Sequence, residues 1–170
     1  ASHTILELTR DVKHLGAETG LITVLHTWGQ NMMEHPHLHC IMPAGGLSFD
    51  KSHWVNTDKK DDFFIYYKVV SRKFRGKFLD LLLKAYDKGQ LIFKGDCLEL
   101  AGKRKFTIFK DKLYKTEWVV NIQKPFGKPE KVLEYLSRYV FRIAITNRRI
   151  IEVKDGKVLF SWKDYRSGHF

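Results

Sequence analysis

The first clear pattern along the chain is a pair of strand-like segments separated by a polar loop. Residues 21–27 are mostly β-branched and apolar, and residues 37–42 again have the composition of a strand, with His37 and His39 alternating with Leu38 and Cys40. Two such segments around a loop of polar and turn residues predict an antiparallel hairpin. If the hairpin pairs symmetrically about its loop, His26 lies opposite His37. Residues 43–46 then end the second strand, and residues 47–62 form a polar stretch with a short strand around Trp54.

A helical pattern follows over residues 69–86. Its apolar positions recur at helical spacing, and four cations crowd its first half: Arg72, Lys73, Arg75 and Lys77. This pattern predicts an amphipathic helix with a basic end. A second helix is predicted from Pro129 to about Phe141, because proline suits the first helical turn and Glu130 complements the helix dipole.

The remaining elements are short. Strands are predicted at residues 91–93, 97–100 and 116–122, and a hairpin is predicted where residues 149–154 and 157–162 flank Asp155-Gly156. Strands and helices in irregular alternation indicate an α+β fold with a mainly antiparallel sheet. A length of 170 residues fits a single domain, residues 1–170.

Composition favours a globular protein that binds a polyanion. The chain carries 30 Lys and Arg against 19 Asp and Glu, giving a net charge of +11. Nucleic acid is the first candidate partner, although a basic surface alone does not choose between DNA, RNA and anionic lipid. Two distant cysteines indicate neither disulfides nor a zinc-thiolate site. Without an apolar segment long enough to span a bilayer or a signal-peptide core, the sequence predicts a cytoplasmic protein without a membrane partner.

Histidines cluster on the first hairpin: His26, His35, His37 and His39. On a strand, His37 and His39 point to the same face about 7 Å apart, and the predicted pairing brings His26 beside them. We therefore expect a metal site formed by His26, His37 and His39, with Gln30 and His35 as alternative ligands or as supports for the ligands. Imidazoles suit zinc, manganese, iron or nickel, so a hydrolase that uses metal-bound water is an alternative at this point.

Two tyrosines stand one turn apart on the second predicted helix. Tyr135 falls on the side that carries the basic residues Lys131, Arg138 and Arg142, and Tyr139 falls between this side and the apolar stripe. Both hydroxyls are placed to reach a phosphate held by these cations. The plainer alternative is a pair of amphipathic tyrosines at the edge of the core.

These residues resemble a known family. The sequence His37-Leu38-His39 resembles the His-hydrophobic-His signature of HUH endonucleases, and Tyr135-xxx-Tyr139 resembles the paired tyrosines of their two-tyrosine branch. The closest likeness is to rolling-circle insertion-sequence transposases of the insertion sequence ninety-one group, which are related to Helitrons. The segments that carry the likeness occur in the expected order: residues 25–30, 35–46, 71–78, 124–127, 135–139, 144–147 and 162–165.

The resemblance implies a ferredoxin-like palm, with a central antiparallel sheet flanked by helices and the HUH strand in its middle. It implies that a tyrosine cuts single-stranded DNA at transposon ends, with or without a hairpin, and becomes joined to the 5′ phosphate. Mg²⁺ or Mn²⁺ is the implied ion, bound by His37 and His39 with His26 as the upstream ligand. Tyr135 and Tyr139 are the implied nucleophiles, and Tyr139 is favoured for the first cut.

The same reasoning assigns DNA contacts to the basic residues of the two helices and of the loop between them: Arg138, Arg142, Lys131, Arg72, Lys73, Arg75 and Lys124. The chain is expected to be the catalytic core of a longer prokaryotic transposase, associated with the nucleoid when it acts. Its oligomeric state is left open. Besides the metal hydrolase, a non-catalytic module that binds single-stranded nucleic acid is the other alternative.

Overall fold

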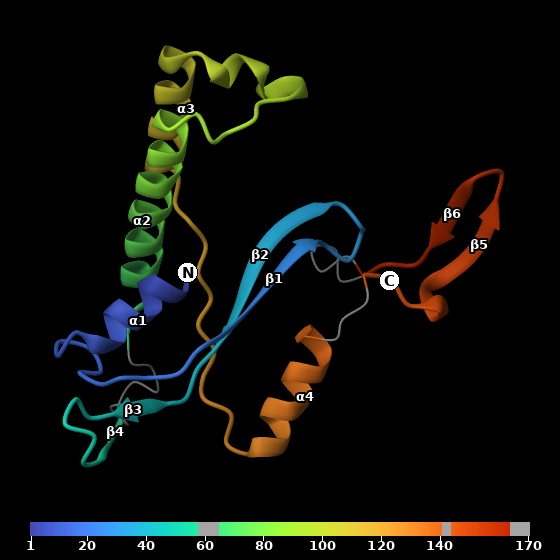
Figure 1. Ribbon diagram of the computed structural model, residues 1–170. Coiled ribbons are helices and arrows are strands. Elements are labelled where there is room, and N and C mark those ends of the chain that lie inside the picture. The colour runs from blue at the N-terminus through green and yellow to red at the C-terminus, as the bar shows by residue number, and fades with distance from the viewer. Residues whose placement is uncertain (58–64, 141–143, 164–170) are drawn as a thin grey trace. The chain divides into compact units, whose positions relative to one another are not determined.

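The computed structural model describes residues 1–57, 65–140 and 144–163, and only the backbone of residues 138–140. The chain forms two compact units (Figure 1). Unit 1 comprises Ala1–Gly20 and Pro43–Pro125, and unit 2 comprises Leu21–Met42 and Phe126–Phe170. The prediction of a single domain over residues 1–170 stays a prediction.

Unit 1 is mainly helical. Its elements are α1 (Ser2–Arg10), β3 (Gly45–Leu47), β4 (Trp54–Asn56), α2 (Tyr67–Asp87), the 3-10 helix η1 (Gly95–Ala101) and α3 (Lys103–Lys115). The predicted helix over residues 69–86 is confirmed as α2, and the short strand around Trp54 is confirmed as β4. The sequence reasoning did not identify α1 or α3, although Phe106, Phe109 and Leu113 recur at helical spacing in α3.

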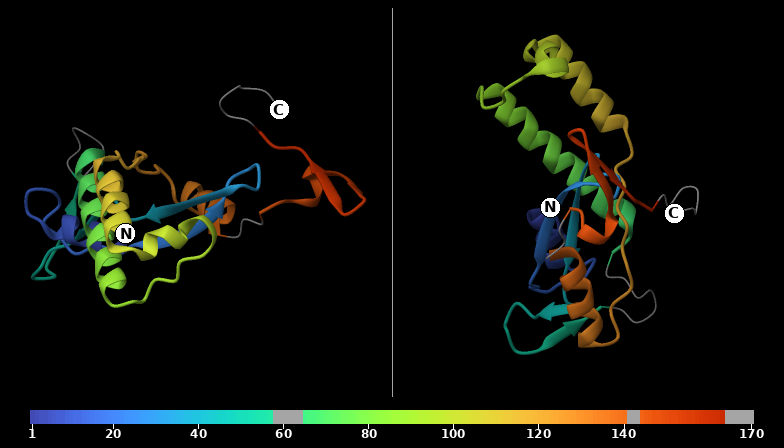
Figure 2. Two further views of the ribbon diagram at one scale, coloured as in Figure 1. Left: turned by 90° about the horizontal axis from the view of Figure 1, so that it is seen from above. Right: turned by 90° about the vertical axis from the view of Figure 1, so that its right-hand side faces the viewer.

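The core of unit 1 lies where α1 and the start of α2 meet. Leu8, Ile65 and Val70 are buried together, and Val120 and Ile122 pack against them. These last two residues belong to a segment that runs along α2 after the end of α3 (Figures 1 and 2).

That segment corrects one prediction, because residues 116–122 form no strand. Its backbone carbonyls are bonded by side chains of α2: Ser71 Oγ donates to the carbonyl of Trp118, 2.5 Å away, and Arg75 donates to that of Thr116 at 2.9 Å. The Trp118 ring packs on Phe74 and Phe78. Trp118, Val120 and Ile122 of this segment therefore pack within unit 1 instead of pairing in a sheet.

The strands predicted at residues 91–93 and 97–100 are also wrong. Residues 91–94 are irregular, and residues 97–100 lie inside η1. The reason is packing at the far end of α2, where Phe106 of α3 stacks on Tyr86 with ring centroids 3.8 Å apart and Phe93 meets the edge of Phe106 at 6.3 Å. Phe93 thus fills a helix–helix contact instead of joining a sheet.

The glycines that were expected only to end the first hairpin are themselves paired. Gly45 and Gly46 lie in β3, opposite Asn56 and Val55 of β4. A Cβ atom on Gly46 would come within 2.6 Å of the Glu18 carbonyl oxygen, and one on Gly45 within 2.5 Å of the Trp54 indole nitrogen. Glycine is needed here because the neighbouring backbone and indole approach closely.

Unit 2 carries most of the segments predicted correctly. Its elements are β1 (Ile22–Trp28), β2 (Glu34–Ile41), α4 (Pro129–Val140), the 3-10 helix η2 (Asn147–Arg149), β5 (Ile150–Lys154) and β6 (Lys157–Phe160). The β1–β2 hairpin, the helix beginning at Pro129 and the β5–β6 hairpin are confirmed. Asp155 and Gly156 have φ angles of 49° and 70°, as the two-residue turn of a hairpin requires.

Among the described residues, the named strands pair with one another only within hairpins, and Leu47 of β3 also bridges Glu18. Throughout the described ranges the strands form three separate two-stranded antiparallel sheets, β1–β2, β3–β4 and β5–β6. The α+β class is confirmed, whereas these strands do not combine into the central sheet that the family resemblance implies. None of the described helices has the length and apolar character needed to cross a membrane.

One ion-pair cluster joins α1 to α2 and gives a prediction on acid stability. Glu7 binds both Lys73 and Lys77, and these two ammonium groups lower the pKa of its carboxyl to about 2. A lowered carboxyl pKa adds stability that is complete above the unfolded-state pKa of about 4.3 and is lost as the pH falls through about 2.

We therefore expect Glu7→Gln to lower the melting temperature at neutral pH and to flatten its pH dependence between about pH 4.3 and pH 2. Thermal unfolding of both proteins across this range measures the effect. Asp87→Asn, at the exposed end of α2, serves as the control and should leave the slope unchanged. Equal slopes for the parent protein and Glu7→Gln would contradict this linkage.

Candidate metal and nucleophile site

The register of the β1–β2 hairpin places three histidines together. His26 pairs with His37, as the symmetric hairpin predicted, and Val24 pairs with His39. Because side chains alternate along each strand, His26, His37 and His39 share one face. The pairing becomes irregular between His26 and Trp28, where the His26 ring stacks on the Trp28 indole with centroids 5.7 Å apart.

The three imidazoles are close and only partly open to solvent. Ring centroids lie 5.3 Å apart for His26 and His37, 4.7 Å for His26 and His39, and 5.0 Å for His37 and His39. His26 is buried, and the other two are half-buried. One ring nitrogen from each residue lies within 4.8 Å of the others, so the group can hold a metal ion.

The donor set fits a divalent ion with open coordination positions. Nitrogens bound to one ion at about 2.1 Å are at most about 4.2 Å apart, so small rotations of the side chains would bring all three into range. Three protein ligands leave positions for oxygen atoms of water or of a substrate. Among the described residues, this trio is the one group of three or more His, Cys, Asp or Glu side chains with such spacing.

The carbonyl of His35 fixes the orientation of His37. It lies 2.6 Å from Nδ1 of His37, and a carbonyl can only accept, so this nitrogen donates. The lone pair of the His37 ring is then on Nε2, the nitrogen that can bind a metal. The imidazole of His35 is exposed and lies outside the trio. The backbone of His35 therefore orients the His37 ring.

Tyr135 of α4 lies beside this cluster. Its hydroxyl is 2.9 Å from Nδ1 of His39, and the two share a hydrogen bond whose donor depends on the tautomer of His39. The two rings meet edge to face, 6.1 Å apart, and Phe126 packs on Tyr135 at 5.4 Å. Tyr135 thus contacts His39 of the histidine cluster within unit 2, although 96 residues separate them in the sequence.

The other residues predicted on α4 are placed less completely. Lys131 forms an ion pair with Glu134 at 3.0 Å and is exposed. The backbone of Arg138 and Tyr139 continues α4, so Tyr139 follows Tyr135 by one turn. Their side chains, and all of Arg142, lie outside the part of the chain that the structure describes.

Four predicted DNA-contacting residues belong to unit 1. Arg72 is exposed on α2, and Arg75 lies with its guanidinium 4.9 Å from the centre of the Tyr114 ring. Lys73 binds Glu7, so its charge is already partly compensated. Lys124 lies in the segment after α3, at the end of the unit.

Two contacts near the site were not anticipated. Arg149 donates to the backbone carbonyl of Gln30 in the β1–β2 loop and to that of Ser161 at 2.8 Å, so it ties the second hairpin of unit 2 to the first. Gln30, predicted as a ligand or support, contributes this carbonyl. Nothing in the sequence distinguishes Arg149 from the other basic residues. Phe126 lies in the segment 124–127 that carries part of the family likeness, which could have indicated its packing role.

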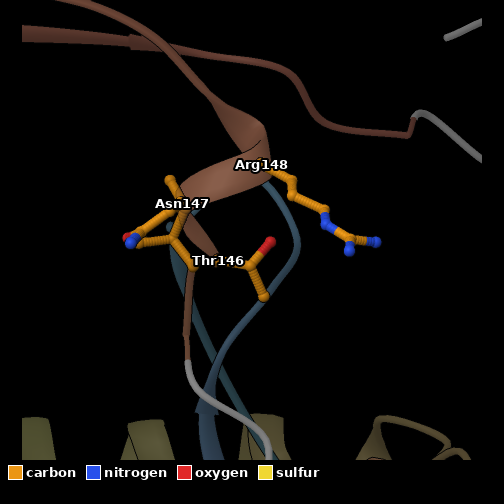
Figure 3. A pocket seen from close by; sticks show the side chains of 4 residues that line it. Thr146, Asn147 and Arg148 are labelled. Carbon is orange, nitrogen blue, oxygen red and sulfur yellow. The ribbon is translucent and has the colours of Figure 1, made fainter.

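A separate hollow of about 520 Å³ lies at η2, lined by Ile145, Thr146, Asn147 and Arg148 (Figure 3). The side chains of Asn147 and Arg148 extend to opposite sides of the short helix. This hollow is formed by one local segment and holds no nucleophile–base pair, so the histidine cluster remains the better candidate for chemistry.

Comparison with known proteins finds similarity to transposases. A family model described as "Putative transposase" matches residues 20–170. The chain is 47% identical over 98% of its length to the "Putative transposase y4qJ" of Sinorhizobium fredii, and 24% identical over 91% of its length to the "Transposase for insertion sequence element IS801" of Pseudomonas savastanoi pv. phaseolicola. It spans 42% and 36% of the length of these relatives.

No solved structure matches the chain. The family match covers both the histidine hairpin and the tyrosine helix, which are the segments brought together in unit 2. The chain therefore belongs to this transposase family, whose members are of the HUH, rolling-circle type.

Proposed function

We propose that this chain carries the nicking and joining centre of a rolling-circle transposase, acting on single-stranded DNA through a 5′-phosphotyrosine intermediate. One observation carries the proposal: the Tyr135 hydroxyl lies 2.9 Å from His39, which belongs to the group of three histidines that can hold a metal. A tyrosine and an imidazole metal site are the two parts that this chemistry needs.

His39 prepares the nucleophile. A phenol has a pKa of about 10, so it attacks poorly until its anion is stabilised. With its proton on Nδ1, His39 donates to the Tyr135 oxygen and thereby favours the phenolate. The packing of Phe126 on the Tyr135 ring restricts the side chain, so less entropy is lost when the hydroxyl is aligned for attack.

The chemistry is a pair of transesterifications. The tyrosine gives up its phenolic proton to water, its oxygen attacks the phosphorus, and the bond from phosphorus to the 3′ oxygen breaks. The 3′ oxygen takes up a proton from water and leaves as a 3′-hydroxyl. The phosphodiester energy is kept in the tyrosine–phosphate bond, and a 3′-hydroxyl that later attacks this bond rejoins the DNA and releases the tyrosine. Mg²⁺ or Mn²⁺ at His26, His37 and His39 would polarise the scissile phosphate and offset its charge.

The two tyrosines are proposed to share these steps. Tyr139 is assigned the first cut from the family pattern, and Tyr135 the second. Both tyrosines lie on α4 four residues apart, a spacing of about one helical turn that allows two nucleophiles to be used in turn. Lys131, Arg138 and Arg142 are proposed to hold the DNA backbone at this helix.

The setting follows from the same proposal. The substrate is the single-stranded end of the element, with or without a hairpin, and the protein acts at the nucleoid in the cytoplasm. The β1–β2 hairpin is proposed to supply the middle strands of the family's ferredoxin-like palm in the longer protein.

A covalent-adduct assay tests the proposal. Labelled single-stranded DNA from the ends of the element is incubated with Mn²⁺ and the protein, and a denaturing gel then shows whether label remains on the protein. We expect an adduct with the parent chain, a reduced yield with either Tyr139→Phe or Tyr135→Phe, and no adduct when both are replaced. Tyr114→Phe, on α3, is the matched control.

Other outcomes separate the alternatives. DNA cleavage that survives the double replacement and leaves no adduct would indicate a hydrolase that uses metal-bound water. Binding without cleavage at any Mn²⁺ concentration would indicate a non-catalytic module, and either result would overturn the proposal.

A further inference from the structure

A second basic feature lies in unit 1, between α2 and the end of α3. A hollow of about 350 Å³, the α2–α3 hollow, is lined by Lys68, Ser71, Arg72, Arg75, Lys115 and Glu117. Its α2 residues stand at positions i, i+3, i+4 and i+7, so they share one face of the helix. The lining contains four cations and one carboxylate.

The cations of the hollow differ from the other cations of the same helix. Lys73 and Lys77 bind Glu7, and Lys84 binds Asp80. Within the described ranges, Lys68, Arg72, Arg75 and Lys115 form no ion pair with a carboxylate. Acidic side chains therefore compensate one side of α2 and leave the hollow positively charged, which favours an anionic ligand.

Arg75 is held in place before any ligand binds. Its guanidinium donates to the Thr116 carbonyl at 2.9 Å and rests on the Tyr114 ring at 4.9 Å. Its Nε is buried and has no hydrogen-bond partner among the described residues. A buried donor without an acceptor is costly, and a small rotation toward a phosphate oxygen in the hollow would supply one.

Exposed aromatic rings accompany these cations. Tyr67 precedes Lys68 and is 40% exposed, Tyr66 is 59% exposed, and Tyr114 precedes Lys115 and is 57% exposed. Cations that follow a phosphate backbone next to rings on which bases stack are typical of surfaces for single-stranded nucleic acid. A free phosphate ion would use the cations but would have no use for the rings.

We infer that the α2–α3 hollow binds the backbone of single-stranded DNA, with Arg72, Arg75, Lys68 and Lys115 contacting phosphates and Tyr114 stacking on a base. This inference rests on the proposed function for the identity of the nucleic acid. It adds Lys68 and Lys115 to the DNA-contacting residues expected from sequence, and it assigns Lys73 to the contact with α1 instead.

The test measures the salt dependence of DNA binding. Fluorescence anisotropy gives the Kd of the whole chain for a labelled single-stranded oligonucleotide over a range of salt concentrations, without divalent metal so that no cleavage occurs. Removing one cation that binds a phosphate should reduce the slope of log K against log salt by about 0.7. Arg72→Gln with Lys115→Gln should therefore reduce it by about 1.4 and raise the Kd on the order of tenfold.

A matched control removes two cations from the same helix outside the hollow. Lys77→Gln with Lys84→Gln deletes the same charge from two lysines that bind Glu7 and Asp80, and we expect it to leave the slope within about 0.3 of the parent value. Tyr114→Leu should weaken binding of the oligonucleotide severalfold while the slope stays near that of the parent. Circular dichroism confirms that each variant is folded.

Two results would overturn the inference: an unchanged slope in Arg72→Gln with Lys115→Gln, or an equal reduction of the slope in the control pair. Suppose that inorganic phosphate competes with the oligonucleotide and that Tyr114→Leu leaves the Kd for phosphate unchanged and does not weaken oligonucleotide binding. The hollow would then be assigned to a free anion instead. The covalent-adduct assay is separate. If the parent chain forms an adduct but Arg72→Gln with Lys115→Gln leaves the salt slope unchanged, only the DNA-binding role of the hollow is rejected. If the slope changes but the parent chain forms no adduct, only the nicking proposal is rejected.

Discussion

Replacing His37 by alanine is expected to lower Mn²⁺ affinity and DNA cleavage by at least about 100-fold. His37 offers one of the three nitrogens that lie within 4.8 Å of one another, and the His35 carbonyl orients its ring so that Nε2 is the nitrogen able to bind a metal. Removal leaves two imidazoles, which hold an ion weakly. Isothermal titration calorimetry with Mn²⁺ and the rate of adduct formation measure the two effects.

His35→Ala is the matched control for this prediction. It removes an imidazole two residues earlier on β2, yet it keeps the backbone carbonyl that orients His37. We expect Mn²⁺ affinity to change less than about threefold, because the ring lies outside the trio. A decrease as large as that in His37→Ala would make His35 a ligand and would reassign the site.

The largest effect on stability is expected from Phe106→Ala. Phe106 is 2% exposed, and its ring stacks on Tyr86 at 3.8 Å and meets Phe93 at 6.3 Å. Truncation removes the aromatic packing between α2 and α3 and leaves a cavity, so the free energy of unfolding of unit 1 should fall by about 3 kcal/mol. Urea unfolding, monitored by hydrogen exchange of the α2 and α3 amides, measures the decrease in the free energy of unfolding of unit 1.

Ile108→Ala provides the comparison on the same helix. Ile108 is 60% exposed, so its truncation should change the free energy of unfolding by less than about 0.5 kcal/mol. Because α3 forms one side of the α2–α3 hollow, Phe106→Ala should also weaken DNA binding there. Similar destabilisation by Phe106→Ala and Ile108→Ala would show that the Phe106–Tyr86 stack contributes little.

The sequence alone determined the elements whose signals are local. Alternation of side chains and a polar loop specify the β1–β2 hairpin, proline specifies where α4 begins, and Asp155-Gly156 specifies the β5–β6 turn. The pairing of His26 with His37 belongs with these, because a strand slipped by one residue would reverse every side chain. The histidine cluster was therefore predictable from two short segments.

Only the tertiary structure decided what lies against these elements. Residues 116–122 have the composition of a strand, but α2 lies beside them and its side chains bond their carbonyls. Lys73 and Arg72 are adjacent and carry the same charge, yet only Lys73 of the two has an ion pair with Glu7 of α1 among the described residues. Tyr135 meets His39 across 96 residues of sequence. Such contacts depend on packing between distant segments, on which a local pattern carries no information.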